Sequence, residues 1–182
     1  PSGQHSAILM RSAAAWEQAV RHLAELGHRR LVYVAGPTGS WSAAERRAAV
    51  QQTARATKLE LDVVQAETPT ADGAIGVVDT VTSRRATAVL AFNDQLALGV
   101  IAELGRRGLH VPGDVSVVGC DDVPMAALVA PPLTTITMPT ADAGAAAVRM
   151  LAEEGPAEVE LSGDLVIRQS PAAVRSRSAT TR

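Results

Sequence analysis

Residues 88–122, AVLAFNDQLALGVIAELGRRGLHVPGDVSVVGCDD, decide the fold. The apolar runs at 87–92 and 115–119 are typical of buried strands, and residues 93–108 between them have the apolar spacing of a helix. A strand, a helix and a second strand in this order form a right-handed crossover, whose two strands lie parallel in one sheet. The stretch therefore predicts an α/β protein built on a parallel sheet.

The same alternation continues on both sides of this stretch. The further strands and helices that the apolar patterns predict are the strands 31–35, 61–66, 134–137 and 164–168 and the helices 14–26, 42–57, 71–83 and 140–154. The helix at 42–57 is expected to begin at Ser42, because Ser42 and Glu45 have the spacing of a capping box. Alternating strands and helices predict a doubly wound sheet with helices on both of its faces.

Composition limits the class of protein. The 182 residues suit one domain, or one large and one small lobe, and a hydrophobic share of 47% can supply a core. A net charge of −2 argues against a nucleic-acid-binding surface in this chain. Cys120 is the only cysteine, which excludes an internal disulfide, and no apolar run is long enough to span a membrane. We expect no metal and no cofactor, and a cytoplasmic location.

Polar residues follow three of the expected strands, at the point where each strand ends. The candidate contacts for a ligand at these strand ends are Trp41, Ser42, Arg46, Asn93 and Asp121. Because the loops at the carboxyl ends of parallel strands diverge and leave a crevice, we expect these side chains to surround one hollow. Carboxylate, carboxamide and guanidinium groups can bond to the neighbouring hydroxyls of a sugar or to the edge of a base. An indole suits the flat face of either ligand.

Each candidate also has a structural interpretation that the sequence leaves open. Asn93 is of a type that commonly caps helices, and Asp121 of a type common in turns. Arg46 could be a solvated helix residue, and Trp41 could pack on a neighbouring proline or at a subunit contact. The coincidence of three loops at one edge of the sheet favours ligand binding.

Motifs for catalysis are absent from the sequence. It contains no glycine-rich dinucleotide or P-loop fingerprint, no zinc-protease motif, no C-x-x-C and no nucleophile elbow. An enzyme on a similar sheet would need a phosphate loop or a catalytic pair. The sequence therefore predicts a binding protein and no enzyme activity.

Several stretches resemble the LacI/GalR family of bacterial transcriptional regulators. They are LGHRRLVYVAGP (26–37), the stretch 88–122, APPLTTITMP (130–139) and DLVIRQS (164–170), so the resemblance extends almost to residue 170. It implies a lobe of the periplasmic-binding-protein type, most of it the C-terminal lobe of a two-lobed sensor. A small effector between the lobes would alter the affinity of the regulator for operator DNA.

The resemblance implies roles for particular residues. Arg46, Asn93 and Asp121 stand where the family contacts its effector, and Trp41 and Ser42 join them because they lie on the same loop. A neutral sugar is the favoured effector, because Arg46 is the only basic residue clearly placed in the pocket; a sugar phosphate or a nucleoside is the alternative. A periplasmic-type sugar-binding protein of a transport system is the alternative function, which a signal peptide upstream would support.

The resemblance also implies a division of the chain. The expected parts are 1–12, a remnant of the N-terminal lobe or a crossover; 13–137, the C-terminal lobe; 138–160, a helix of the N-terminal lobe and a crossover; 161–170, the closing strand of the C-terminal lobe; and 171–182, a flexible tail. The family's helix-turn-helix headpiece is missing from the chain, which we expect to be truncated at its N-terminus. Operator DNA would be bound only through that missing element.

A homodimer is the expected assembly. The family pairs its C-terminal lobes through an apolar stretch that corresponds to 124–133 and through the neighbouring helix. Leu98, Leu128 and Val129 are therefore the expected contacts across a two-fold axis. Ordinary core packing is the alternative for these three residues.

Overall fold

The computed structural model describes residues 6–152 and 157–174, and its main feature is a six-stranded sheet. In spatial order the strands are β3 (Glu60–Gln65), β2 (Arg30–Ala35), β4 (Ala88–Ala91), β5 (Ser116–Asp121), β6 (Thr134–Thr137) and β8 (Leu165–Val166). The first five run parallel, with Tyr33 of β2 opposite Leu90 of β4, and β8 closes the edge antiparallel to β6. The predicted parallel α/β sheet is confirmed, with one antiparallel strand at its edge.

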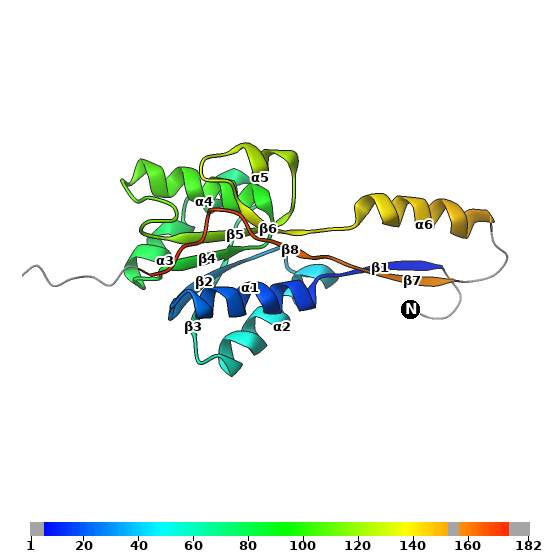
Figure 1. The fold of residues 1–182 in the computed structure, drawn as a ribbon, viewed down its shortest axis with the longest axis horizontal. Helices are drawn as coiled ribbons and strands as arrows, with labels where there is room; N and C mark the ends of the chain where they lie inside the picture. The colour runs from blue at the N-terminus through cyan, green and yellow to red at the C-terminus, as the bar shows by residue number, and fades with distance from the viewer. Residues whose placement is uncertain (1–5, 153–156, 175–182) are drawn as a thin grey trace, which may run out of the picture.

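Helices cover both faces of this sheet (Figure 1). One face carries α1 (Ala13–Glu25) and α2 (Trp41–Ala56), and the other carries η1 (Ala71–Ala74), α3 (Val77–Ser83), α4 (Asp94–Arg106) and α5 (Pro124–Leu128). Side chains alternate along a strand, so Val32 and Val34 of β2 enter the core under α3 and α4 while Leu31 and Tyr33 enter the core under α1 and α2. The central strands are buried on both faces, as a doubly wound sheet requires.

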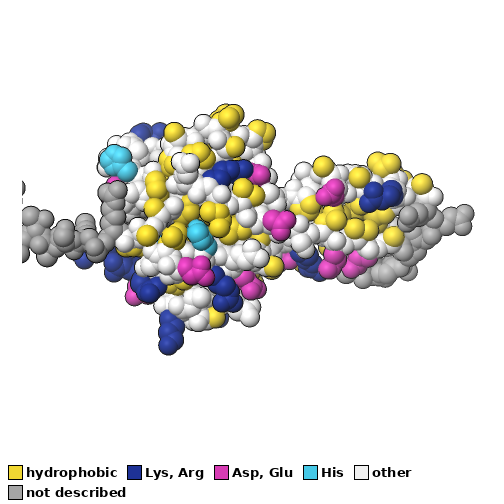
Figure 2. All heavy atoms as spheres, viewed as in Figure 1, with side chains coloured by type: hydrophobic (Ala, Val, Ile, Leu, Met, Phe, Trp, Pro, Cys, Tyr) yellow, Lys and Arg dark blue, Asp and Glu magenta, His cyan; other side chains and the backbone are white. Residues whose placement is uncertain are grey.

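A second, smaller unit projects from one end of the main body (Figure 1). It consists of β1 (Ala7–Arg11) and β7 (Glu158–Ser162), which pair in parallel, and of α6 (Thr140–Ala152), which contacts both. Hydrophobic side chains gather on the surface of this unit (Figure 2), and Val148 and Leu151 of α6 are 68% and 87% exposed. The predicted division into lobes stays a prediction, but the chain does form two unequal units.

The start of α2 differs from the prediction. The helix begins at Trp41, and Ser40 caps it: its hydroxyl accepts a hydrogen bond from the amide of Ala43 at 3.3 Å. Ser40 follows a glycine turn and has the extended backbone of a cap, whereas Ser42 already lies inside the helix. The predicted capping box of Ser42 and Glu45 is therefore wrong.

Other elements shift in their limits. The predicted helix at 71–83 is two short helices separated by Ile75 and Gly76, and β5 runs two residues further than expected, to Asp121. The strands β1 and β7 were not predicted, and the strand expected at 164–168 is only two residues long. Of the helix expected at 140–154, residues 153 and 154 lie outside the described residues. No helix in the described ranges has the length and apolar character needed to cross a bilayer.

The segment predicted as a flexible tail begins in contact with the main body. The Ala172 amide donates to the hydroxyl of Ser116 in β5, and this hydroxyl donates to the Ala172 carbonyl. The Val174 amide donates to the Leu26 carbonyl at 3.0 Å. The imidazole of His28 lies 3.2 Å from the Ala172 carbonyl, and its burial lowers the His28 pKa. Residues 171–174 are thus bound to the body, and residues 175–182 lie outside the described part of the chain.

Candidate ligand-binding site

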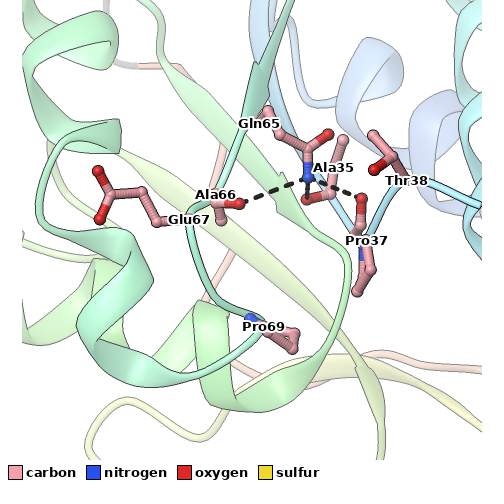
Figure 3. A pocket seen from close by; sticks show the side chains of 8 residues that line it. Ala35, Pro37, Thr38, Gln65, Ala66, Glu67 and Pro69 are labelled. Atoms are coloured by element: carbon pink, nitrogen blue, oxygen red, sulfur yellow. Dashed lines mark hydrogen bonds between the residues drawn. The ribbon is translucent and has the colours of Figure 1, made fainter.

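The carboxyl ends of the parallel strands form one edge of the sheet, and a hollow of about 380 Å³ opens there. Figure 3 shows the residues that line it: Ala35, Gly36, Pro37, Thr38, Gln65, Ala66, Glu67 and Pro69. They belong to the ends of β2 and β3 and to the loops that follow these two strands. A crevice at this edge is what the parallel topology predicts.

Gln65 joins the two loops of the hollow. Its side-chain amide donates to the carbonyls of Gly36 at 2.8 Å and Ala35 at 3.3 Å, whereas Glu67 points away from this contact (Figure 3). Gln65 is absent from the predicted contacts, because that prediction used the ends of three other strands and not the end of β3. The signal was present, since Gln65 ends a strand that was correctly predicted.

Arg46 is buried at this edge, with only 5% of its surface exposed. Its Nη1 donates to the Phe92 carbonyl at 2.7 Å, and the guanidinium lies 4.6 Å from the centre of the Phe92 ring. Its Nη2 is 3.7 Å from Oδ1 of Asp121, and its buried Nε has no hydrogen-bond partner. The solvated-surface interpretation of Arg46 is therefore wrong. The N–H group at Nε is the part of the guanidinium that has no hydrogen-bond acceptor.

Asp121 stands at the end of β5 with a backbone φ of 113°, in the left-handed region. Its side chain is 40% exposed, so one part faces Arg46 and another part can be reached from solvent. Burial raises the pKa of the Asp121 carboxyl, and the charge of Arg46 opposes this rise. The structure thus brings together two of the predicted residues, from α2 and β5.

Asn93 caps α4 and also bonds to Pro69, one of the residues that line the hollow. Its Oδ1 accepts from the amide of Leu96 at 2.9 Å, and its Nδ2 donates to the carbonyl of Pro69 at 2.8 Å. The capping interpretation is confirmed. The second bond ties the start of α4 to the loop that lines the hollow, so a ligand contact by Asn93 stays a prediction.

Trp41 lies apart from the other candidates. Its ring is 53% exposed, and the Arg11 guanidinium lies 4.9 Å from the ring centre. Five residues of helix separate Trp41 from Arg46, which places their side chains about 140° apart around the axis. Ser42 is one turn before Arg46 on the same face, and its hydroxyl lies 3.0 Å from that of Ser40. Trp41 therefore stacks with a cation, while Ser42 shares the face of Arg46.

The predicted dimer contacts have different surroundings. Leu128 on α5 is 77% exposed, whereas Leu98 and Val129 are partly buried and pack against the core under α3 and α4. The buried parts of Leu98 and Val129 therefore belong to the core of one chain, and a role of these residues in a dimer stays a prediction. Among the residues that the structure describes, no group of three His, Cys, Asp or Glu side chains could hold a metal ion.

The chain is similar to bacterial transcriptional regulators over about half of their length. A family model described as a periplasmic binding protein-like domain matches residues 20–171. The transcriptional regulator MalR of Streptomyces coelicolor is 37% identical over 171 residues, which are 87% of this chain and 50% of that protein. The repressor PurR of Vibrio parahaemolyticus is 34% identical over 139 residues, covering 74% of this chain and 42% of that protein. The chain spans about half the length of the curated relatives it matches.

Solved structures share the fold over most of the chain. The complex of the regulator CelR with cellobiose has a TM-score of 0.84 and 29% identity, covering 93% of this chain and 55% of that one. A dimeric Lac repressor has a TM-score of 0.84 and 28% identity, covering 92% and 64%. A LacI family regulator from Enterococcus faecalis with bound ribose has a TM-score of 0.85 and 26% identity, covering 96% and 66%.

These similarities agree with the architecture. The matched range contains the whole succession from β2 to β8, and with it the edge at which Arg46 meets Asp121. The resemblance inferred from the sequence is confirmed. The chain belongs to the periplasmic binding protein-like family, as an effector-binding domain of the LacI/GalR type of transcriptional regulator.

Proposed function

We propose that this domain binds a small neutral sugar at the carboxyl edge of its sheet, and that binding shifts the operator affinity of the regulator. The observation that carries the proposal is the pair formed by buried Arg46 and half-exposed Asp121 at the carboxyl edge of the sheet, the edge at which the hollow opens, although neither residue lines the hollow itself. Two of the structural neighbours hold ribose or cellobiose, which adds support for a sugar.

The charge of this pair favours a neutral ligand. Arg46 already faces a carboxylate, so an anionic ligand would compete with Asp121 for the guanidinium. A sugar hydroxyl can instead donate to Asp121 and accept from Arg46 at the same time. Gln65 and Thr38 add polar groups along the wall of the hollow.

Regulation would follow from a difference in affinity. An effector that binds one arrangement of the domain more tightly shifts the population toward it, and operator affinity changes by the same coupling free energy. We propose that operator DNA is bound by a helix-turn-helix segment, that the regulator acts in the cytoplasm, and that it forms a homodimer through the surface around Leu128. The dimeric Lac repressor among the structural neighbours supports the last point.

Calorimetry and thermal shift with ribose, cellobiose, glucose and adenosine test the proposal on the full chain. We expect one of the sugars to bind, and Asp121→Asn to abolish that binding. Asparagine is the substitution of choice because it tolerates the left-handed backbone at this position. The free energy of unfolding should change by less than about 1 kcal/mol.

Asp142→Asn is the matched control, because it makes the same change on exposed α6. It should leave sugar binding as in the wild type. Binding of adenosine alone would replace the sugar with a nucleoside, and full binding by the Asp121 variant would remove the site from this edge.

A further inference from the structure

A second aspartate lies directly behind the candidate site. Asp94 is the first residue of α4 and has no exposed surface. Its Oδ1 accepts a hydrogen bond from the Thr135 hydroxyl at 2.6 Å, and its Oδ2 accepts one from the Val123 amide at 2.9 Å. One carboxylate thus connects the start of α4, the segment after β5 and the strand β6.

Thr135 extends this connection by one residue. Its hydroxyl oxygen, which donates to Asp94, also accepts from the amide of Asp122 at 3.4 Å. The two amides that follow Asp121 are therefore both held, one by Asp94 itself and one through Thr135. The side chain of Asp122 is held separately, by Nη2 of Arg168 at 2.7 Å.

The backbone between these contacts is unusual. Asp121 and Asp122 have φ values of 113° and 50°, both in the left-handed region, which non-glycine residues adopt only when their surroundings impose it. Gly119, two residues earlier, has no room for a side chain, because a Cβ atom there would collide with Oδ1 of Asp94. The Asp94 carboxylate is thus packed directly against β5, the strand that ends at Asp121.

We infer that Asp94 and Thr135 are positioning residues for the effector site, which fix the backbone after β5 so that the Asp121 carboxylate faces Arg46. The inference rests on the proposed function of that site. The hydrogen bonds make it specific: the donors to Asp94 and Thr135 come from the two residues after Asp121, where a change in φ would redirect the Asp121 side chain.

Thr135→Val tests the inference in the full chain with the sugar found above. Valine keeps the shape of threonine and removes only the hydroxyl, which frees the Asp122 amide and one oxygen of Asp94. We expect sugar binding to weaken about ten-fold or more, and Thr135→Ser, which restores the hydroxyl, to recover most of the affinity.

Thr134→Val is the matched control. Thr134 is equally buried on the same strand, but its hydroxyl accepts from the backbone amide of Arg168, whose side chain holds the Asp122 carboxylate, and it makes no hydrogen bond to the amides of Asp122 and Val123. This variant should lose stability as Thr135→Val does, yet bind the sugar as the wild type does. Equal loss of binding in both valine variants would overturn the inference, because stability alone would then explain the result.

Asp94→Asn provides a second variant if Thr135→Val does not fold. The amide keeps the volume of the carboxyl group but accepts at one oxygen only, so either the Val123 amide or the Thr135 hydroxyl loses its carboxylate acceptor. Crystal structures of these variants without ligand give a readout that needs no effector. We expect Asp121 to leave its positive φ and to move away from Arg46.

The two readouts separate the proposals. If the wild type binds none of the four compounds, the proposed function fails, while the ligand-free structures still decide the positioning role. If the variants keep the φ of Asp121 and its contact with Arg46, the positioning role is refuted, whatever the wild type binds.

Discussion

Arg46 is a charged residue with almost no exposed surface, and its partners explain how the protein keeps it there. The Phe92 carbonyl accepts from one nitrogen, the Phe92 ring lies against the guanidinium, and Asp121 supplies the opposite charge. Desolvating a guanidinium is costly unless such partners are present. A buried arginine that points at a strand end is therefore strong support for a function of this residue beyond packing.

Asp94 gives the clearest prediction at the residue scale. Burial raises its pKa to about 6, although Thr135 and Val123 donate hydrogen bonds to the carboxylate. The nearby charges of Asp121 and Asp122 add to the rise. Since the folded-state pKa lies above the unfolded value of about 3.9, the folded protein holds this proton more tightly. The stability that the Asp94 proton adds to the folded protein is therefore complete below the pKa of the unfolded state. It is lost as the pH rises through the pKa of the folded state.

We therefore expect the stability of Asp94→Asn relative to the wild type to rise with pH, by at most about 3 kcal/mol between about pH 4 and about pH 7.5, on top of a pH-independent loss from the hydrogen bond that asparagine cannot accept. Urea denaturation at several pH values measures the difference. Glu103→Gln, on the same helix, should show the opposite trend, because hydrogen bonds from Arg107 and Arg106 lower the Glu103 pKa. A difference between Asp94→Asn and wild type that does not vary with pH would contradict the prediction.

At the scale of elements, α4 depends on Asn93 in two ways that can be separated. The carbonyl oxygen caps the helix, and the amide nitrogen holds Pro69. Asn93→Asp keeps an oxygen for the cap and loses the donor, whereas Asn93→Ala loses both. Chemical denaturation should show a loss of about 1 kcal/mol for Asn93→Ala and a smaller loss for Asn93→Asp.

Sugar binding by the same two variants then tests the site. If the Pro69 loop shapes the hollow, both variants should weaken binding, and Asn93→Asp should do so with little loss of stability. Unchanged binding by Asn93→Asp would show that Asn93 caps the helix and does not shape the sugar site.

The link between the small unit and the main body rests on Arg11 at the end of β1. Its guanidinium bonds to Glu160 of β7 at 2.8 Å, lies 3.6 Å from Glu45 of α2 and covers one face of the Trp41 ring. Trp16, the other tryptophan, has no exposed surface. Fluorescence quenching by acrylamide should therefore report mainly on Trp41.

We expect Arg11→Gln to increase this quenching, because the cation that shields the indole is removed. Trp41→Phe should leave only the poorly quenched signal of Trp16. Equal quenching of wild type and Arg11→Gln would show that the stacked arrangement does not persist in solution.

The sequence predicts these elements better than their ends and contacts. Periodicity places β2, β4 and α4 to within one or two residues, because each is long or fully buried. It misses β1 and β7, whose pairing joins distant parts of the chain. It also places the cap of α2 at Ser42, because both serines are good caps and only Ser42 has a glutamate at capping-box spacing. Likewise nothing local to Trp41 indicates that Arg11 will stack on it.

At the scale of the whole molecule, assembly can be tested at two equally exposed leucines. Leu128 on α5 is 77% exposed and Leu151 on α6 is 87% exposed, but only Leu128 lies on the surface proposed for the dimer. We expect Leu128→Asp to shift the mass measured by light scattering from dimer to monomer. Leu151→Asp should leave the dimer intact, and the reverse pattern would move the interface to α6.

The whole fold was predictable in class and the site only in part. The edge at which the loops diverge follows from the alternation of parallel strands and helices, so Arg46 and Asp121 were expected together. The contacts of Gln65 and Asp94 emerge only from the structure, because they involve carbonyls and amides that lie close in space but not in sequence.

The pairing of β1 with β7 has a consequence for the order in which the protein takes shape during synthesis. Arg11 and its partner Glu160 are 149 positions apart, so at about 5–20 residues per second the ribosome makes the first strand about 7 to 30 seconds before the second exists. The five parallel strands of the doubly wound body can assemble in that interval, because only its edge strand β8 is made after β7. The early strand meanwhile has an open edge, which a chaperone or a neighbouring nascent chain could reach.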